Sequence, residues 1–149
     1  MEEKNDYNEL KERMLRIAAE FENYKKRVKD DSDRARSTGK AEVIRDLLPV
    51  LDEFELALIT IESAQDKGLA KGIEMVYSNL LETLKREGLT EIDTKGVFDP
   101  YKHEIMLSRP DGKRKPGTII EVMKKGYMLD KIMLRPASVI VSKEEEEKK

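Results

Sequence analysis

The most constraining feature of the sequence is an apolar stripe near its N-terminus, in which the steps between apolar residues alternate between four and three. The stripe consists of Leu10, Met14, Ile17, Phe21, Tyr24 and Val28. This spacing is typical of a coiled coil, and most residues off the stripe are charged or small. A single amphipathic helix lying on a globular core would give the same stripe, but this segment has no neighbour of its own to cover it. The pattern therefore favours a self-associating stem helix over residues 1–38.

The stripe fails after Val28, because Asp31, Ala35 and Thr38 stand where apolar residues are due. The run from Ser37 to Gly39 also has low helix propensity. The sequence therefore predicts a break or a soft spot in the helix near Gly39.

A second apolar series follows and is wider than a two-stranded seam, which favours packing in a helix bundle. Its members are Val43, Ile44, Leu47, Leu48, Leu51, Phe54, Leu58 and Ile61. Pro49 stands inside this series, where a proline normally costs about 3 kcal/mol and kinks a helix. We still expect a helix, because the periodicity holds on both sides of Pro49.

A third apolar series predicts another helix after a loop at Glu62–Gly68, with Gly88 as its C-cap. Its members are Leu69, Ile73, Val76, Tyr77, Leu80, Leu81 and Leu84. The two helices would form a hairpin over residues 39–94. If two chains pair, two hairpins give a four-helix bundle, whose interface would include Leu47, Leu51, Phe54 and Leu58.

The sequence beyond Gly88 changes character and contains short β-rich runs separated by turn signals at Asp111-Gly112 and Lys125-Gly126. The expected strands are Glu104–Leu107, Thr118–Met123, Tyr127–Leu134 and Ser138–Val141. We therefore expect a compact β-domain over residues 95–143, followed by a disordered charged tail at 144–149. The fold class is α+β, with a paired stem helix, a helical hairpin and a small C-terminal β-domain.

The residue types needed for catalysis are scarce. The sequence has no Cys, which excludes disulfides, thiolate metal sites and thiol nucleophiles. His103 is the single histidine, and Leu107 stands where a two-histidine zinc motif would need the second, so a structural or surface role is expected. Gly39-Lys40 and Gly112-Lys113 lack the rest of a phosphate-binding loop. We expect no catalytic residues, no metal and no cofactor, and therefore not an enzyme.

The N-terminus lacks the basic start and apolar run of a secretory signal, and no segment approaches eighteen consecutive apolar residues. We expect a cytoplasmic protein that does not act on a membrane. Although the net charge is only −2, residues 95–143 carry 11 basic against 5 acidic side chains. Lys113-Arg114-Lys115 would form a basic loop tip, which suits an acidic protein partner, a nucleic acid or simple solvation. With only Tyr101 and Tyr127 for base stacking, nucleic-acid binding ranks last among the functions considered.

Several motifs, in their order and spacing, resemble the signature of the GrpE family. In the β-region they are Val97–Glu104, Gly117–Leu129 and Leu134–Val141. In the helical region Ala19–Arg27 looks like the family's stem motif, Asp46–Asp52 like its bundle motif, and Lys71–Glu74 like a third motif. The resemblance extends from about residue 10 to residue 142.

This resemblance implies a parallel homodimer and a nucleotide exchange factor for a DnaK-type chaperone. Such a factor binds the nucleotide-binding domain of the chaperone and favours an open cleft that releases ADP, alongside a DnaJ-type co-chaperone, in protein folding and the heat-stress response. No covalent chemistry is required. The alternative is a coiled-coil dimerisation scaffold without exchange activity. Because the stripe contains polar insertions, a further hypothesis is a stem that melts on heating and reduces exchange.

The resemblance also implies chaperone contacts, carried over position by position. Phe98 and Pro100 would supply apolar contact, Met123 an adaptable contact on a strand, and Gly72 a close approach at the bundle; on the stem, Lys25 and Arg34 would supply charge. Core packing for the apolar residues and simple solubility for the charged ones remain alternatives. Ile132 stands where many members have a basic residue, and we expect Lys131 to take over that charge.

Overall fold

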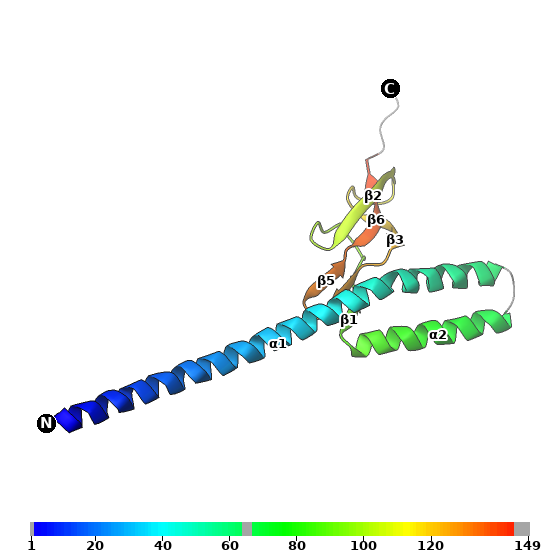
Figure 1. Ribbon diagram of the computed structural model, residues 1–149. Helices are drawn as coiled ribbons and strands as arrows, with labels where there is room; N and C mark the ends of the chain where they lie inside the picture. The colour runs from blue at the N-terminus through cyan, green and yellow to red at the C-terminus, as the bar shows by residue number, and fades with distance from the viewer. Residues whose placement is uncertain (1, 64–66, 145–149) are drawn as a thin grey trace. The chain divides into compact units, whose positions relative to one another are not determined.

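The computed structural model describes residues 2–63 and 67–144, with side chains described for residues 6–61 and 67–144 (Figure 1). The chain divides into two compact units, one up to Lys40 and one from Ala41 onward. The first unit is the N-terminal part of helix α1. The second contains the rest of α1, helix α2 and six strands, counted over the described residues.

Helix α1 spans Glu2–Ser63 without interruption and includes Pro49. The sequence predicted a break or a soft spot near Gly39; no break is found, and the soft spot stays a prediction. A single glycine costs a helix only about 1 kcal/mol relative to alanine, and helix on both sides outweighs that cost. Directly after Gly39, Ala41 and Ile44 are buried in the core, which holds this part of the backbone in the helix.

Helix α2 spans Lys67–Arg86. The expected loop at Glu62–Gly68 is shorter than predicted, because α1 continues to Ser63 and α2 begins at Lys67, while residues 64–66 lie outside the described part. Gly88 ends the helix with a φ of 101°, and its N–H donates to the carbonyl oxygen of Lys85 at 3.0 Å. This left-handed residue confirms the predicted C-cap.

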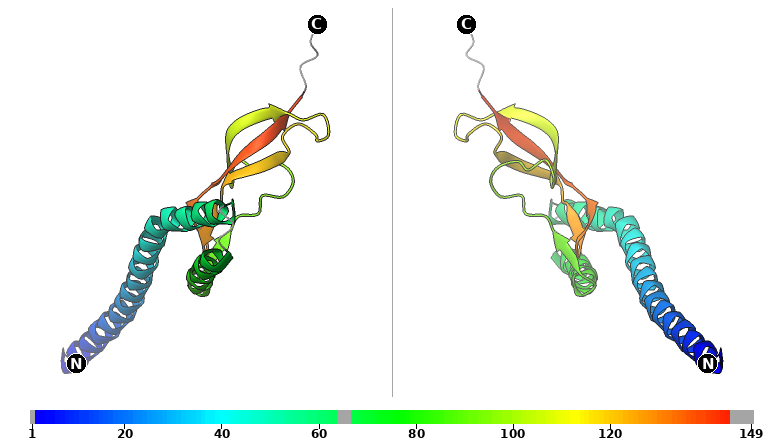
Figure 2. Two further views of the ribbon diagram at one scale, coloured as in Figure 1. Left: turned by 90° about the vertical axis from the view of Figure 1, so that its right-hand side faces the viewer. Right: turned by 90° about the vertical axis from the view of Figure 1, so that its left-hand side faces the viewer.

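The strands form two small sheets, and the sheet β1-β4-β5 lies between the helical hairpin and the sheet β2-β6-β3 (Figure 2). Pairing is antiparallel throughout, except that β2 and β6 are parallel. The first sheet consists of β1 (Leu89–Glu91), β4 (Tyr127–Leu129) and β5 (Ile132–Arg135). The second consists of β2 (His103–Pro110), β6 (Ala137–Lys143) and β3 (Ile119–Lys124).

These elements confirm the α+β class and three of the predicted strands. The prediction of a single strand over Tyr127–Leu134 is wrong, because Asp130 adopts a left-handed φ of 51° and turns the chain between β4 and β5. Strand β1 was not predicted, since three residues are too short to show a period. The charged tail predicted at 144–149 lies, from residue 145 onward, outside the described residues.

Two apolar cores hold the second unit together. The first core joins both helices to the sheet β1-β4-β5 and includes Leu48 and Leu51 from α1, Leu84 from α2, and Tyr127 and Leu129 from β4. The second core underlies the sheet β2-β6-β3 and contains Ile92, Ile119, Ala137, Val139 and Val141, with Phe98 and Met128 packed against it. Met128 of β4 thus links the first sheet to the second core.

Candidate partner-binding site

The segment before β2 is fixed by hydrogen bonds around His103. The Nδ1 of His103 accepts a bond from the N–H of Asp99 at 3.0 Å, and its Nε2 lies 2.8 Å from the carbonyl oxygen of Asp93. Because Nδ1 accepts, Nε2 carries the proton and donates. His103 is buried, and both its nitrogens bond to backbone, which confirms the structural role expected for it.

This segment places Phe98 and Pro100 differently. Phe98 is half-buried, packs against the second core, and lies with its ring centroid 6.1 Å from that of His103. Pro100 is exposed, as is Tyr101, whose N–H is held by the Asp99 carboxylate at 2.9 Å. Phe98 therefore has a packing role of its own, whereas Pro100 lies at the surface.

Met123 on β3 is 59% exposed and borders a groove of about 320 Å³ between β3 and the C-terminal part of α1. The apolar part of the groove is completed by Leu56 and Ile59, which are also exposed. An unbranched, adaptable side chain beside an open groove lined by both apolar and charged residues suits contact with a protein partner.

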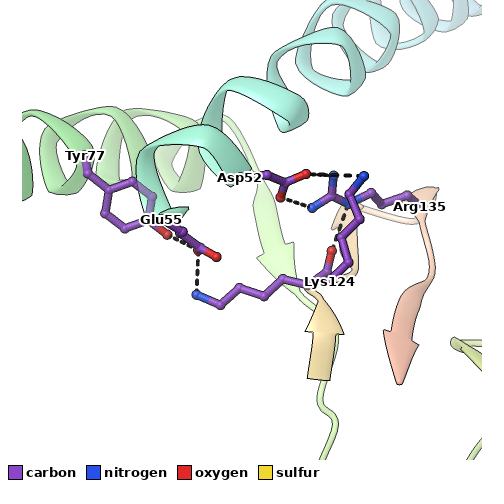
Figure 3. Close-up of polar contacts among 6 residues, drawn as sticks. Asp52, Glu55, Tyr77, Lys124 and Arg135 are labelled. Carbon is purple, nitrogen blue, oxygen red and sulfur yellow. Dashed lines mark hydrogen bonds and ion pairs between the residues drawn. The ribbon is translucent and has the colours of Figure 1, made fainter. Parts of the chain in front are cut away.

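Beside this groove, acidic side chains of α1 face basic side chains of the β-region (Figure 3). The Arg135 guanidinium binds both carboxylate oxygens of Asp52, with Nη1 to Oδ2 at 2.6 Å. Lys124 also reaches Asp52, with its Nζ 3.4 Å from Oδ2. One turn further along α1, Glu55 accepts a 2.7 Å bond from the Nζ of Lys125.

Two further contacts extend this charged cluster. The hydroxyl of Tyr77 on α2 donates to Glu55 at 2.5 Å, and the Nε of Arg135 donates to the carbonyl oxygen of Lys125 at 2.8 Å. Burial, and then the hydrogen bond and charge of Glu55, raise the pKa of Tyr77 well above its ordinary value. Tyr77 is therefore a neutral donor at physiological pH, and α2 is connected through Glu55 to the β-region.

The electrostatics of Asp52 favour its ionised form. Partial burial raises its pKa, but the hydrogen bonds and charge of Arg135, followed by those of Lys124, outweigh burial and hold the pKa below its ordinary value of 3.8. Sequence reasoning gave these residues no role. The available signal was that Asp52, Lys124, Lys125 and Arg135 all lie in the motifs quoted above.

The remaining predicted contacts are not among the residues that line the groove. Lys131 is exposed in the β4–β5 turn, while the neighbouring Ile132 packs against the first core. Gly72 is exposed on α2, with open space where a Cβ would lie. In the first unit, Arg34 is exposed, and Lys25 pairs with Glu22 at 2.5 Å and lies 5.1 Å from the centroid of the Phe21 ring.

The residues predicted for dimerisation fall into two groups. The six stripe residues of the stem are all exposed on the single chain, from 46% at Val28 to 65% at Met14. Among the hairpin residues, Phe54 and Leu58 are half-buried, Leu47 packs against the first core, and Leu51 is fully buried within it. The chain's own core thus accounts for Leu51, while the stem stripe is exposed on the single chain.

The continuous stem helix, the helical hairpin and the two small sheets define an α+β protein in which a small β-region is attached to a predominantly helical framework. Residues 1–143 match the family model described as GrpE. The chain belongs to the GrpE family.

Curated relatives agree with this assignment. The chain is 40% identical over 136 residues to a protein described as "Protein GrpE" from Parageobacillus thermoglucosidasius, covering 90% of this chain and 61% of that relative. It is 42% identical over 132 residues to the protein of the same description from Geobacillus thermodenitrificans, covering 87% of this chain and 60% of that relative. For the relative from Halalkalibacterium halodurans the identity is 39% over 135 residues, covering 89% and 70%. The chain thus spans about 60% of the length of the first two relatives.

No helix in residues 2–63 or 67–144 is long and apolar enough to cross a membrane.

Proposed function

We propose that this chain is a nucleotide exchange factor for a DnaK-type chaperone, with no covalent chemistry of its own. Membership of the GrpE family over residues 1–143 carries the proposal. The exposed Met123 beside a groove with apolar and charged walls supports it, because a partner could bind there without rearrangement of the core. In the proposed mechanism, the factor binds the nucleotide-binding domain of the chaperone and releases ADP, which supports protein folding and the heat-stress response.

The proposed mechanism is a population shift. The factor must bind the open cleft of the chaperone more tightly than the ADP-closed cleft, and it can shift the equilibrium only by that difference in affinity. Reciprocity then requires that ADP weaken the binding of the factor. Exposed apolar and basic side chains of the β-region, among them Met123, Pro100 and Lys131, would form the contact.

The proposed assembly is a homodimer. Residues 1–38 would pair as a coiled-coil stem, residues 39–94 would form a four-helix bundle, and residues 95–143 would be the β-domain that binds the chaperone. The exposed stripe of the stem favours this assembly, because an unpaired apolar stripe on a helix is normally covered. Gly72, Lys25 and Arg34 would add contacts outside the β-domain. A DnaJ-type co-chaperone would act with the complex in the cytoplasm, a compartment compatible with a chain that lacks Cys.

The proposal also includes a temperature response. The polar insertions at Asp31 and Thr38 interrupt the stripe, so the stem would melt before the β-domain and exchange would fall on heating.

The direct test is release of fluorescent ADP from the host's DnaK-type chaperone in stopped flow. The protein should accelerate release, and Met123→Asp should weaken the effect because it places a charge at the proposed contact. Met106→Asp is the matched control, since Met106 is 61% exposed on the other edge strand of the same sheet. A folded dimer that gives no acceleration would support the scaffold alternative instead.

A further inference from the structure

Two acidic residues one turn apart on α1 contact three basic residues of the β-region. Asp52 binds Arg135 and Lys124, and Glu55 binds Lys125. We call these five residues the charged clamp. The clamp joins α1 to the end of β3, to the link between β3 and β4, and to the end of β5.

The Arg135–Asp52 pair of the clamp is less exposed than an ordinary surface ion pair, whereas the side chain of Lys124 is 50% exposed. The side chain of Arg135 is only 15% exposed and that of Asp52 28%. The guanidinium uses two nitrogens on the carboxylate and a third on the backbone carbonyl of Lys125. Exposed single pairs contribute little, but a bidentate, partly buried network fixes geometry and leaves an uncompensated charge when one partner is removed.

The clamp fastens a sheet that lacks an apolar anchor on the helices. Within the described residues, the second core, under the sheet β2-β6-β3, is formed by residues from Ile92 onward and includes none from α1 or α2. The polar contacts of Lys124 and Lys125 therefore connect this sheet directly to the helix. The first core fixes the other sheet to both helices. Strand β3 is held by its pairing with β6 and by Met128 of β4 packing against the second core, and the clamp adds the direct polar contact between the end of β3 and α1.

Met123 directly precedes Lys124, and the groove beside Met123 is lined by both acidic residues of the clamp. We infer that Asp52 and Glu55 are positioning residues for the proposed chaperone-binding surface, holding β3 and Met123 at a fixed place relative to α1. This inference rests on the proposed exchange function. It also gives a role to charged residues of the family-like motifs that make no predicted contact with the chaperone.

The expected effect on exchange follows from the fraction of molecules whose surface is correctly placed. When only part of the population is competent to bind, the apparent dissociation constant rises by the inverse of that fraction. Loosening the clamp should therefore raise the concentration of factor needed for half-maximal ADP release. The maximal rate at saturation should stay the same, because bound molecules have the correct arrangement.

The variants are Asp52→Asn and Glu55→Gln, which keep side-chain size and remove charge. Glu53→Gln is the matched control, because Glu53 lies between them in sequence on the same helix and is exposed. Each clamp variant should raise the half-saturating concentration about fivefold, while the control changes it by less than about twofold. Amide hydrogen–deuterium exchange should be faster in β3 of the clamp variants than in β3 of the wild-type protein. The amides of Tyr127 and Leu129 in β4, which belong to the first core, should exchange at the wild-type rate.

The charge swap Glu55→Lys with Lys125→Glu provides a second test that does not depend on a single substitution. Each single change should raise the half-saturating concentration, and the double variant should recover most of the loss. Unchanged half-saturation in Asp52→Asn and Glu55→Gln, with an active wild-type protein, would overturn the inference. Faster β3 exchange in the variants together with no ADP release by the wild-type protein would instead reject the exchange function and leave the clamp standing.

Discussion

The backbone N–H of Asp130 donates a 3.0 Å hydrogen bond to the carbonyl oxygen of Gly88. The bond joins the β4–β5 turn to the C-terminal cap of α2, and both residues have left-handed backbone conformations, with φ values of 51° and 101°. A Cβ on Gly88 would overlap the carboxylate of Asp130. This contact therefore requires glycine at position 88 for two reasons, conformation and space.

Replacing Gly88 with alanine should destabilise the fold by about 1–3 kcal/mol, because the left-handed conformation is strained for alanine and the Asp130 side chain must move. Gly72→Ala is the control, since Gly72 lies inside α2 with open space around it. That change should stabilise the protein by about 0.5–1 kcal/mol. Urea unfolding measures both, and equal effects of the two substitutions would contradict the role of Gly88.

Leu51→Ala should destabilise the protein by about 2–5 kcal/mol, because Leu51 is fully buried in the first core and its removal leaves a cavity. Leu56→Ala, five residues along the same helix, removes a side chain that is 64% exposed and should change stability by less than about 0.5 kcal/mol. Thermal unfolding of the two variants side by side makes the comparison. A small effect of Leu51→Ala would mean that the first core is not packed as described.

The elements that the sequence predicted are those with a repeated local signal. The helical series around Leu48 and Leu80 recurs over several turns, and the strand around Val139 shows a continuous β-branched run. Strand β1 has only three residues and is defined by its pairing with β4, a partner far along the chain. Local pattern cannot reveal it, because its register is set by tertiary contact. The uninterrupted helix at Gly39 has the same cause, since packing of Ala41 outweighs propensity.

The candidate site was predictable only in part, for a related reason. Motifs identified Met123 as a surface contact, and exposure of that side chain agrees with this. For Phe98 the sequence allowed either a core position or a surface contact, and the structure shows that it packs against the second core. In the clamp, Asp52 and Arg135 are 83 positions apart in the sequence, and Glu55 and Lys125 are 70 positions apart. Because 40% of the residues are charged, the sequence around one charged residue does not indicate which distant residue it pairs with.

The contribution of Asp52 to stability should depend on pH. Its pKa is lower in the folded protein than its ordinary value of 3.8, because Arg135 and Lys124 outweigh the effect of burial. A depressed folded pKa stabilises the fold above the unfolded pKa, and this contribution is lost as pH falls through the folded pKa. The stability difference between wild type and Asp52→Asn should therefore be constant near neutral pH and shrink below about pH 4. Urea unfolding at a series of pH values checks this, and a difference that grows toward acid would contradict the pairing.

The proposed dimer should depend on the stem stripe. Ile17 is 56% exposed on the single chain and lies on the stripe, so Ile17→Asp should place a charge in the paired seam and shift the protein toward monomer. Leu15→Asp is the matched control, because Leu15 is 62% exposed on α1 but off the stripe. Sedimentation equilibrium should give a dimer for wild type and control, and a lower mass for Ile17→Asp. Equal masses for all three proteins would place the dimer contact elsewhere.

The interrupted stripe predicts that the stem melts at a lower temperature than the rest of the protein. Polar and small residues at Asp31, Ala35 and Thr38 leave the end of the stem without apolar partners across a paired seam, so it should melt at a lower temperature than the β-region. Circular dichroism should therefore show two transitions, and ADP release should slow during the first. Replacing Asp31 and Ala35 with leucine would extend the stripe, raise the first transition, and keep exchange active at temperatures where the wild-type protein has lost it. One cooperative transition in the wild-type protein, or exchange that falls at the same temperature in the leucine variant, would mean that the stem does not sense heat.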